Sequence, residues 1–322
     1  MTHALTFAHL SDPHLTTLTG VKMTDLLNKR ILGYLTWRFS RRYEHLSKVL
    51  DAAVTDLRHT RPDHVVVTGD LTHLGLPEEF RQAAQWLHTL GSAHDITVIP
   101  GNHDAYVRTV WDQTYAQWWP YLAAGQALDG GSPPANDPQA LFPTVQYRGR
   151  VAFIGLSTAL PSAPFYAVGS VGADQLQRLD SILQDTGERG YCRILLIHHP
   201  PLPGTVRHSK RLTDSEALQT VLMRRGAELV LHGHTHRNCR AELATPLGVI
   251  PVMGVPSTSA IGHKPGHRAQ YYLYRVTPSA HGWDLHVSIR GYSSAEDRFV
   301  AEGEIPLAVE RPGPAAVEAP PG

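Results

Sequence analysis

Five short apolar segments of this chain each run directly into a cluster of polar, chemically reactive side chains. Their length, their β-branched residues and the flanking glycines and prolines predict buried strands rather than pieces of helix. The five predicted strands comprise residues 5–10, 64–67, 96–99, 193–197 and 228–231.

Helical patterns lie between these strands. Residues 44–59 carry apolar side chains with the period of a helix, residues 77–91 begin with proline and end with glycine, and Thr213-x-x-Glu216 is a capping box. Alternation of strands and helices predicts right-handed βαβ units, which bind their ligands beyond the carboxyl ends of the strands. All five polar clusters fall at that edge, so we expect them to converge.

The chain changes character after residue 236. Strand-like sequences at residues 249–253, 271–276 and 283–289 predict a second sheet packed on the first. Residues 125–138 hold three glycines and three prolines, which predicts a loop. From residue 303 onward the chain is rich in Pro, Ala and Gly, and we expect a disordered tail there.

Composition narrows the class of protein. The 322 residues are 42% hydrophobic and 18% charged, which is the balance of a globular chain. Lys plus Arg equals Asp plus Glu at 29 each, so no binding of a nucleic-acid polymer is expected. Two cysteines exclude a disulfide scaffold. Without a secretory signal at residues 1–7, or an apolar run of the ~18 residues that a membrane span needs, a cytoplasmic protein is expected.

The polar clusters contain seven side chains with carboxylate, imidazole or amide ligands. This set suits Mn, Fe or Zn, and it exceeds what one tetrahedral ion can use. Two ions ~3.5–4 Å apart, with one carboxylate between them, would fit the number of ligands. The candidate ligands are Asp12, His14, Asp70, Asn102, His198, His234 and His236.

In order and spacing, these motifs resemble the signature of the calcineurin-like metallophosphoesterases, from residue 5 to about residue 237. Within that superfamily, Gly69-Asp70-Leu71-Thr72 and the His198-His199 pair look most like the bacterial class III phosphodiesterases, which include cyclic-nucleotide and glycerophosphodiester hydrolases. The resemblance implies an α/β fold, a four-layer α/β/β/α sandwich with two central mixed β-sheets. It also implies one domain over residues 1–302, followed by the tail at 303–322.

The resemblance further implies roles for the site residues. Asp12, His14, Asp70 and His236 would hold the first metal, and Asp70, Asn102, His198 and His234 the second, with Asp70 as the bridge. His103 would face the phosphate and the leaving group, and Asp104 would orient it. The expected reaction is hydrolysis of a phosphodiester P–O bond by direct attack of a metal-bound hydroxide, with His103 protonating the leaving group.

A basic segment follows the first motif directly. Residues 22–42 hold six Lys or Arg and one acid, Asp25, with apolar residues at helical spacing. They could form a lid that contacts a phosphorylated substrate through Arg38, an interfacial helix on anionic lipid at the inner face of the membrane, or an insertion with solvated charges. The other candidate substrate contacts are His73, His199, His263, Lys264 and Arg268, although 262–268 also fits a solvated loop.

Two further hypotheses stay open at this point. The partner would be a phosphorylated small molecule or, if lipid contact is real, a lipid-linked substrate, which suggests a pyrophosphohydrolase of the UDP-diacylglucosamine type. A non-catalytic, metal-stabilised interaction module is the alternative from another class. The presence of all ligands and of His103 favours catalysis.

Overall fold

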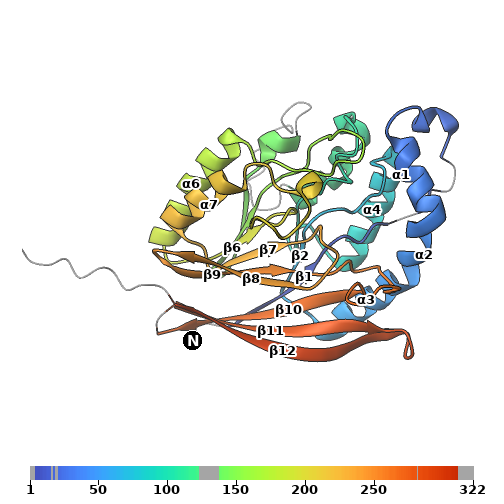
Figure 1. Ribbon diagram of the computed structural model, residues 1–322. Coiled ribbons are helices and arrows are strands. Elements are labelled where there is room, and N and C mark those ends of the chain that lie inside the picture. The colour runs from blue at the N-terminus through green and yellow to red at the C-terminus, as the bar shows by residue number, and fades with distance from the viewer. Residues whose placement is uncertain (1–3, 16, 19–20, 123–137, 281, 311–322) are drawn as a thin grey trace, which may run out of the picture.

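Two six-stranded sheets form the centre of the protein in a computed structural model (Figure 1), which describes residues 4–15, 17–18, 21–122, 138–280 and 282–310. The first sheet has the order β12-β11-β10-β1-β2-β3 and the second β4-β5-β6-β7-β9-β8. Both are mixed: β1 is parallel to β2 and antiparallel to β10, and β9 is parallel to β7 and antiparallel to β8. The strands are β1 (Leu5–Leu10), β2 (His64–Val67), β3 (Ile96–Val98), β4 (Thr144–Arg148), β5 (Val151–Gly155), β6 (Cys192–Leu196), β7 (Leu229–His232), β8 (Cys239–Thr245), β9 (Gly248–Gly254), β10 (Gln270–Ser279), β11 (Gly282–Ser293) and β12 (Arg298–Glu310).

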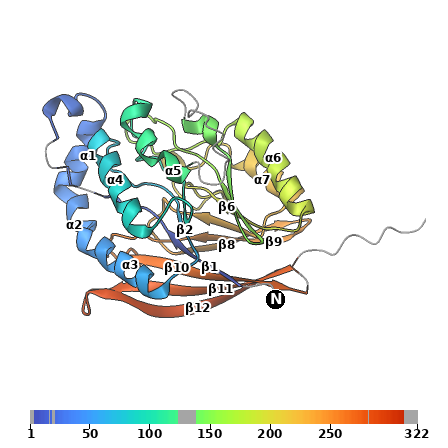
Figure 2. The same cartoon turned by 180° about the vertical axis from the view of Figure 1, so that it is seen from behind.

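Helices cover the outer face of each sheet, as both views show (Figures 1 and 2). Helices α3 (Ser47–Thr60) and α4 (Pro77–Leu90) pack with the first sheet, and α6 (Ala173–Glu188) and α7 (Ser215–Arg225) pack with the second. The predicted four-layer α/β/β/α sandwich is confirmed. Shorter elements are η3 (Trp111–Gln113), η4 (Tyr115–Trp118), α5 (Trp119–Leu122), η5 (Pro138–Leu141) and η6 (His208–Lys210).

Side chains that alternate along β5 supply two cores. Phe153 points to the other sheet, where its ring meets Phe7 of β1 edge to face with centroids 5.1 Å apart. Ala152 and Ile154 face the opposite way, into the core beneath α6 and α7. This alternation follows from the period of two in a strand, and it fixes which face of the second sheet carries helices.

The five strands predicted before the polar clusters are all present, as β1, β2, β3, β6 and β7. The prediction that residues 249–253, 271–276 and 283–289 form a second sheet is wrong, because β9 joins the sheet of β6 and β7, whereas β10 and β11 join the sheet of β1. The predicted capping box is wrong by one position, because Asp214 is the residue that precedes α7. Thr213 instead donates its hydroxyl to the Gly169 carbonyl oxygen. The Asp214 carboxylate accepts hydrogen bonds from the Val171 and Gly172 backbone N–H groups, so it holds the start of α6 rather than the start of α7.

The expected disordered tail is also wrong for residues 303–310, which belong to β12. These residues continue the antiparallel ladder with β11, and Leu307 and Val309 are buried. Pro306 misled the prediction; β12 is the edge strand of its sheet, where a residue without an N–H group is tolerated. The described residues do not include 311–322. Of the predicted loop 125–138, they include only residue 138.

The basic segment folds into a chain of short helices at the end of the molecule opposite α6 and α7 (Figures 1 and 2). It comprises η1 (Met23–Leu26), α1 (Arg30–Thr36), the π-helical turn η2 (Trp37–Arg41) and α2 (Arg42–Glu44). One side packs on the domain, where Leu26, Tyr34 and Trp37 meet a small apolar cluster. No helix among the described residues is long and apolar enough to cross a bilayer.

Candidate metal centre

Four predicted ligands converge just beyond the carboxyl ends of β1, β2 and β7. Asp12, His14, Asp70 and His236 each offer a ligand atom within 4.8 Å of the others. Asp12 Oδ1 lies 3.1 Å from His236 Nε2, and His14 Nε2 lies 4.0 Å from Asp70 Oδ2. The first three side chains are buried. The residues predicted for the first metal therefore form one compact group.

Asp70 also belongs to a second group. Its ligand atom lies within 4.8 Å of those of His198 and His234, and Asp70 Oδ2 is 3.3 Å from His198 Nε2. Asn102 joins this group through its Oδ1, which lies 3.2 Å from His198 Nε2. The second predicted set is thus assembled as well, and Asp70 is the residue common to both.

Five of the seven candidate ligands have left-handed backbone conformations. Their φ angles are 49° at Asp12, 42° at His14, 56° at Asp70, 65° at His234 and 54° at His236. Non-glycine residues rarely adopt this conformation, which costs free energy and concentrates at functional sites. The turns after three separate strands are therefore shaped to aim these side chains at one point.

A glycine keeps the second group close together. At Gly101, a Cβ would lie 2.3 Å from Asp70 Oδ1 and 2.8 Å from His198 Cε1. Any side chain there would displace the shared carboxylate, because the contact falls on atoms that are themselves buried.

Backbone carbonyl groups orient the imidazole rings. Nδ1 of His14 lies 3.1 Å from the Thr72 oxygen, and Nδ1 of His198 lies 2.7 Å from the Thr68 oxygen. His234 is turned the other way, with its Nε2 2.9 Å from the Lys210 oxygen. A nitrogen that donates to a carbonyl leaves the opposite nitrogen free to bind a metal, as in metal sites generally.

The cluster buries carboxylate groups whose negative charge a metal cation would neutralise. Burial opposes ionisation of Asp70, but the rings of His198 and His103 hold its pKa well below the usual value. Burial likewise lowers the pKa of His198, yet Asp70 outweighs it and raises that pKa to about 9. Oδ1 of Asp12 is buried, and its described polar neighbours are ring nitrogens, His236 Nε2 at 3.1 Å and His14 Nε2 at 3.9 Å. Buried carboxylate oxygens that face imidazole nitrogens fit divalent metal ions well.

His103 lies beside the metal ligands and is oriented by a backbone group, not by Asp104. Its Nδ1 donates to the His73 oxygen at 2.7 Å, and its Nε2 accepts from Arg41 Nη1 at 2.9 Å. Burial and Arg41 together lower the pKa of His103 to about 3. The ring is therefore neutral, with Nε2 directed toward Arg41.

Asp104 has a different role from the one expected. Its carboxylate accepts hydrogen bonds from the backbone N–H groups of Asp70, Thr72 and Gly101 and from the Thr72 hydroxyl, at 2.8 to 3.0 Å. No hydrogen bond joins it to the His103 ring among the described contacts. The prediction that Asp104 orients His103 is wrong, and Asp104 is a positioning residue that ties together the two loops carrying Asp70 and Asn102.

A pocket of about 470 Å³ lies over the two ligand groups. Among the predicted substrate contacts, His73 and Lys264 line it. The other four do not. Arg38 is exposed, His199 is fully buried between Thr158 and the Ala167 oxygen, His263 faces the Tyr43 oxygen, and Arg268 binds Glu302 and the Tyr292 oxygen.

Sequence reasoning missed three residues at the site. Arg41 reaches the site from the basic segment. The charge of that segment indicated a contact with a phosphorylated substrate, but the contact was assigned to Arg38. Lys210 lines the pocket. The buried ring of His45 lies 4.7 Å from that of His14, and its Nδ1 is 2.7 Å from the Ser259 hydroxyl. Nothing in the spacing of His45 indicated this position.

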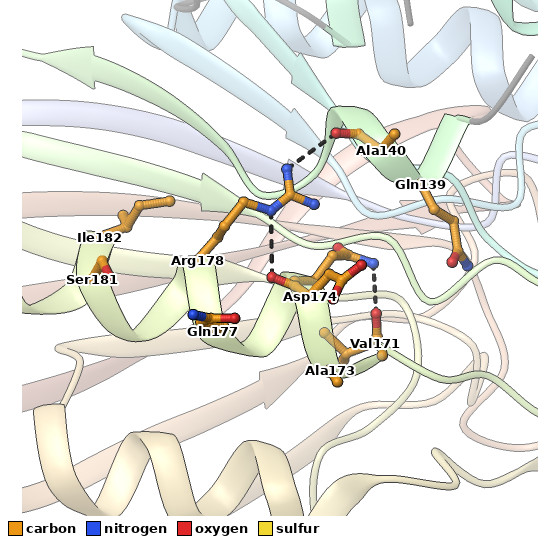
Figure 3. Close-up of a pocket in the computed structure, with 11 residues that line it drawn as sticks. Gln139, Ala140, Val171, Ala173, Asp174, Gln177, Arg178, Ser181 and Ile182 are labelled. Atoms are coloured by element: carbon orange, nitrogen blue, oxygen red, sulfur yellow. Dashed lines mark hydrogen bonds between the residues drawn. The ribbon is translucent and has the colours of Figure 1, made fainter. Parts of the chain in front are cut away.

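A larger surface hollow near the start of α6 is separate from the metal centre (Figure 3). It contains none of the candidate ligands and shares no lining residue with the pocket above them. Its one arginine, Arg178, donates to the Ala140 and Asp174 carbonyl oxygens. Among the described residues, the groups that could hold a metal lie at the strand ends and not in this hollow.

The fold and the ligand groups define a metallophosphoesterase. Residues 5–238 match the calcineurin-like phosphoesterase family, so the chain belongs to that family. It is 32% identical over 149 residues to the glycerophosphodiester phosphodiesterase GpdQ of Enterobacter lignolyticus, an alignment that covers 44% of each chain. It is 26% identical over 211 residues to a probable cyclic nucleotide phosphodiesterase of Synechococcus, covering 65% of this chain and 69% of that one. The chain thus spans less than half the length of the first of these relatives.

Solved structures share the fold. A dimetal phosphatase from Danio rerio superposes with a TM-score of 0.60 at 14% identity, over 95% of this chain and 99% of that one. The purple acid phosphatase PPD1 of yellow lupin superposes with a TM-score of 0.51 at 13% identity, over 95% of this chain and 54% of that one. The four-layer arrangement is therefore that of known phosphoesterases.

Proposed function

We propose that the protein hydrolyses phosphodiesters at a dinuclear metal centre, by direct attack of water and without a covalent enzyme intermediate. The observation that carries the proposal is the sharing of Asp70 between two complete ligand groups. Asp12, His14 and His236 would hold one ion with Asp70, and Asn102, His198 and His234 the other. When bound, such ions supply Lewis acidity that activates water and takes up charge on phosphoryl oxygens.

Arg41 and His103 would act on the substrate side of the centre. The guanidinium group of Arg41 has no carboxylate within ion-pairing distance among the described residues; its polar contact is with His103. A cation so placed in the pocket favours a phosphoryl oxygen as its partner. His103 Nε2 now accepts a hydrogen bond from Arg41 and carries no proton. A phosphate anion bound beside the ring would favour its protonated form, and Nε2–H would then hydrogen-bond the phosphate and give its proton to a departing alkoxide.

A phosphodiester is the favoured substrate class because both relatives are named for cleaving diesters. Since the GpdQ alignment spans less than half of either chain, the individual substrate does not transfer with it. Lipid-linked pyrophosphate cleavage is a second candidate, favoured by the exposed apolar residues of the basic segment. A non-catalytic module is disfavoured because His103 and every ligand are in place.

The test is metal reconstitution followed by a hydrolysis panel. Apo-protein would be loaded with Mn, Fe or Zn, the bound metal counted, and turnover measured on bis-p-nitrophenyl phosphate, a glycerophosphodiester, a cyclic nucleotide and a phosphomonoester. We expect two ions per chain and turnover of at least one diester above the monoester. Asp70→Asn is the matched control. A protein that binds two ions and cleaves none of these substrates, nor a lipid-linked pyrophosphate, would refute the proposal.

A further inference from the structure

A row of apolar side chains is left exposed along the basic segment. They recur every fourth residue from position 23 to position 43, and each is between 43% and 80% exposed. We call them the apolar ridge: Met23 (71%), Leu27 (80%), Ile31 (43%), Leu35 (44%), Phe39 (73%) and Tyr43 (54%). Six exposed apolar side chains within 21 residues are an unusual concentration, and exposed apolar surface of this kind marks a site of interaction.

The ridge is not needed to pack the segment on the domain. The opposite side does that, through Leu26, Tyr34 and Trp37 in the small apolar cluster. Arg30 adds hydrogen bonds to the Leu74 and Gly75 oxygens. The segment is therefore anchored by side chains other than those of the ridge, of which Met23, Leu27 and Phe39 are more than 70% exposed.

Positive charge accompanies the ridge. Residues 22–42 carry six bases and one acid, in a chain whose net charge is zero. Lys22, Arg38 and Arg42 are exposed beside the ridge, and the Arg42 guanidinium lies over the Tyr43 ring. Apolar residues interleaved with bases are the chemistry that binds an anionic lipid surface.

The pocket opens beside the same segment. Leu32, Thr36 and Arg41 of the segment line it, together with Phe165 and Tyr166, which are 86% and 49% exposed. Lys29 Nζ links the segment to the 162–166 stretch by donating to the Ser162 oxygen at 2.9 Å. The basic segment therefore forms part of the rim of the pocket above the metal centre.

We propose that the apolar ridge, with Lys22, Arg38 and Arg42, docks the protein on an anionic bilayer, so that the metal centre acts on a phosphoester carried by a lipid. The substrate part of this inference rests on the proposed function; the docking part does not. A second copy of the chain fits this face less well, because a two-fold contact would set the bases of one ridge against those of the other.

Vesicle flotation tests the docking. We expect the wild-type protein to float with vesicles of phosphatidylcholine and phosphatidylglycerol, and to do so much less with phosphatidylcholine alone or in high salt. Replacing Leu27 and Phe39 by serine should weaken binding about 100-fold, taking about tenfold for each apolar side chain removed. Arg38→Gln with Arg42→Gln should weaken it by about 20- to 30-fold, at about fivefold for each charge.

Leu247→Ser with Val249→Ser is the matched control. Both side chains are apolar and exposed, at 43% and 48%, which is the exposure of Ile31 and Leu35 in the ridge. They lie at the start of β9, which runs parallel to β7 and therefore begins at the sheet edge opposite the metal centre. This variant should bind vesicles as the wild type does. Equal losses in the control and the ridge variants, or no binding of the wild type, would overturn the proposal.

Kinetics separate this proposal from the proposed function. The Leu27→Ser, Phe39→Ser variant should keep its turnover on a small soluble diester and lose turnover on a phosphoester presented in anionic vesicles. Vesicle binding without hydrolysis of any substrate would refute the catalytic proposal and leave the docking intact. Ridge-dependent dimerisation in light scattering, with no vesicle binding, would show that the face is instead a contact between copies.

Discussion

Replacing Asp104 by asparagine should loosen the metal centre rather than disable His103 alone. The Asp104 carboxylate accepts four hydrogen bonds, two on each oxygen: Oδ2 from the N–H groups of Asp70 and Gly101, and Oδ1 from the N–H and hydroxyl of Thr72. Asparagine keeps one acceptor oxygen, and its NH₂ group takes the place of the other, where it faces groups that need an acceptor. If the NH₂ group faces Thr72, the Thr72 hydroxyl can rotate to accept a hydrogen bond from it, but the Thr72 backbone N–H loses its acceptor.

The expected loss of stability follows from the number of hydrogen bonds that the substitution removes. One or two buried donors lose their acceptor, at about 1–3 kcal/mol each, so Asp104→Asn should lower the free energy of unfolding by about 1–6 kcal/mol. This is a large part of the stability of an ordinary domain, typically about 5–15 kcal/mol. Metal affinity should fall as well, because the loops held by Asp104 carry Asp70 and Asn102.

Urea unfolding of the apo-protein, with bound metal measured by elemental analysis, checks this prediction. His103→Gln is the control, since it changes the neighbouring side chain without touching those four hydrogen bonds. An Asp104→Asn variant with wild-type stability, two bound ions and a loss of turnover alone would refute this reasoning. It would instead support the role of Asp104 as the orienting partner of His103.

Three further predictions concern the metal centre. Asp70→Ala should abolish turnover and lower the metal content more than His236→Ala does, because Asp70 alone belongs to both groups; two retained ions would contradict this. His103→Ala should keep both metals and lose about 10²–10⁴-fold in turnover with poor leaving groups, and less with nitrophenolate; equal losses would mean that His103 only binds the phosphate. Arg41→Gln should lower kcat/KM by about 10- to 100-fold at unchanged metal content, the size of a lost hydrogen bond to a charged group, and an unchanged KM and kcat would place Arg41 outside substrate binding.

The sequence predicted the parts of the site that are tied to strand ends. Each ligand follows a buried strand within a few residues, and the parallel strands β1 and β2 bring Asp12 and Asp70 to one edge. Asp70 and His198 follow strands of different sheets, and the family resemblance was what grouped them. His45 and Arg41 could not be placed, because they reach the site through the path of irregular helices. Asp104 was wrongly predicted to orient His103, because most of its hydrogen-bond donors are backbone N–H groups, which no sequence pattern identifies.

Strand β12 shows the same limit at the level of the fold. Its one proline, Pro306, and its small residues resemble the tail that follows, yet its partner β11 is long enough to extend the ladder to Glu310. Pairing of that kind depends on tertiary context, which local composition does not contain.

The left-handed backbone conformation of five ligand residues lowers the stability of the protein but positions the side chains that activity needs. Each of the five non-glycine residues at positive φ costs roughly 1–2 kcal/mol relative to an ordinary backbone, and glycine would remove most of that cost. Glycine at Asp12 or His236 would also remove a ligand. Directed evolution for heat resistance alone would therefore favour variants that fold better and catalyse nothing, so a selection for robust versions of this enzyme has to score turnover in every round.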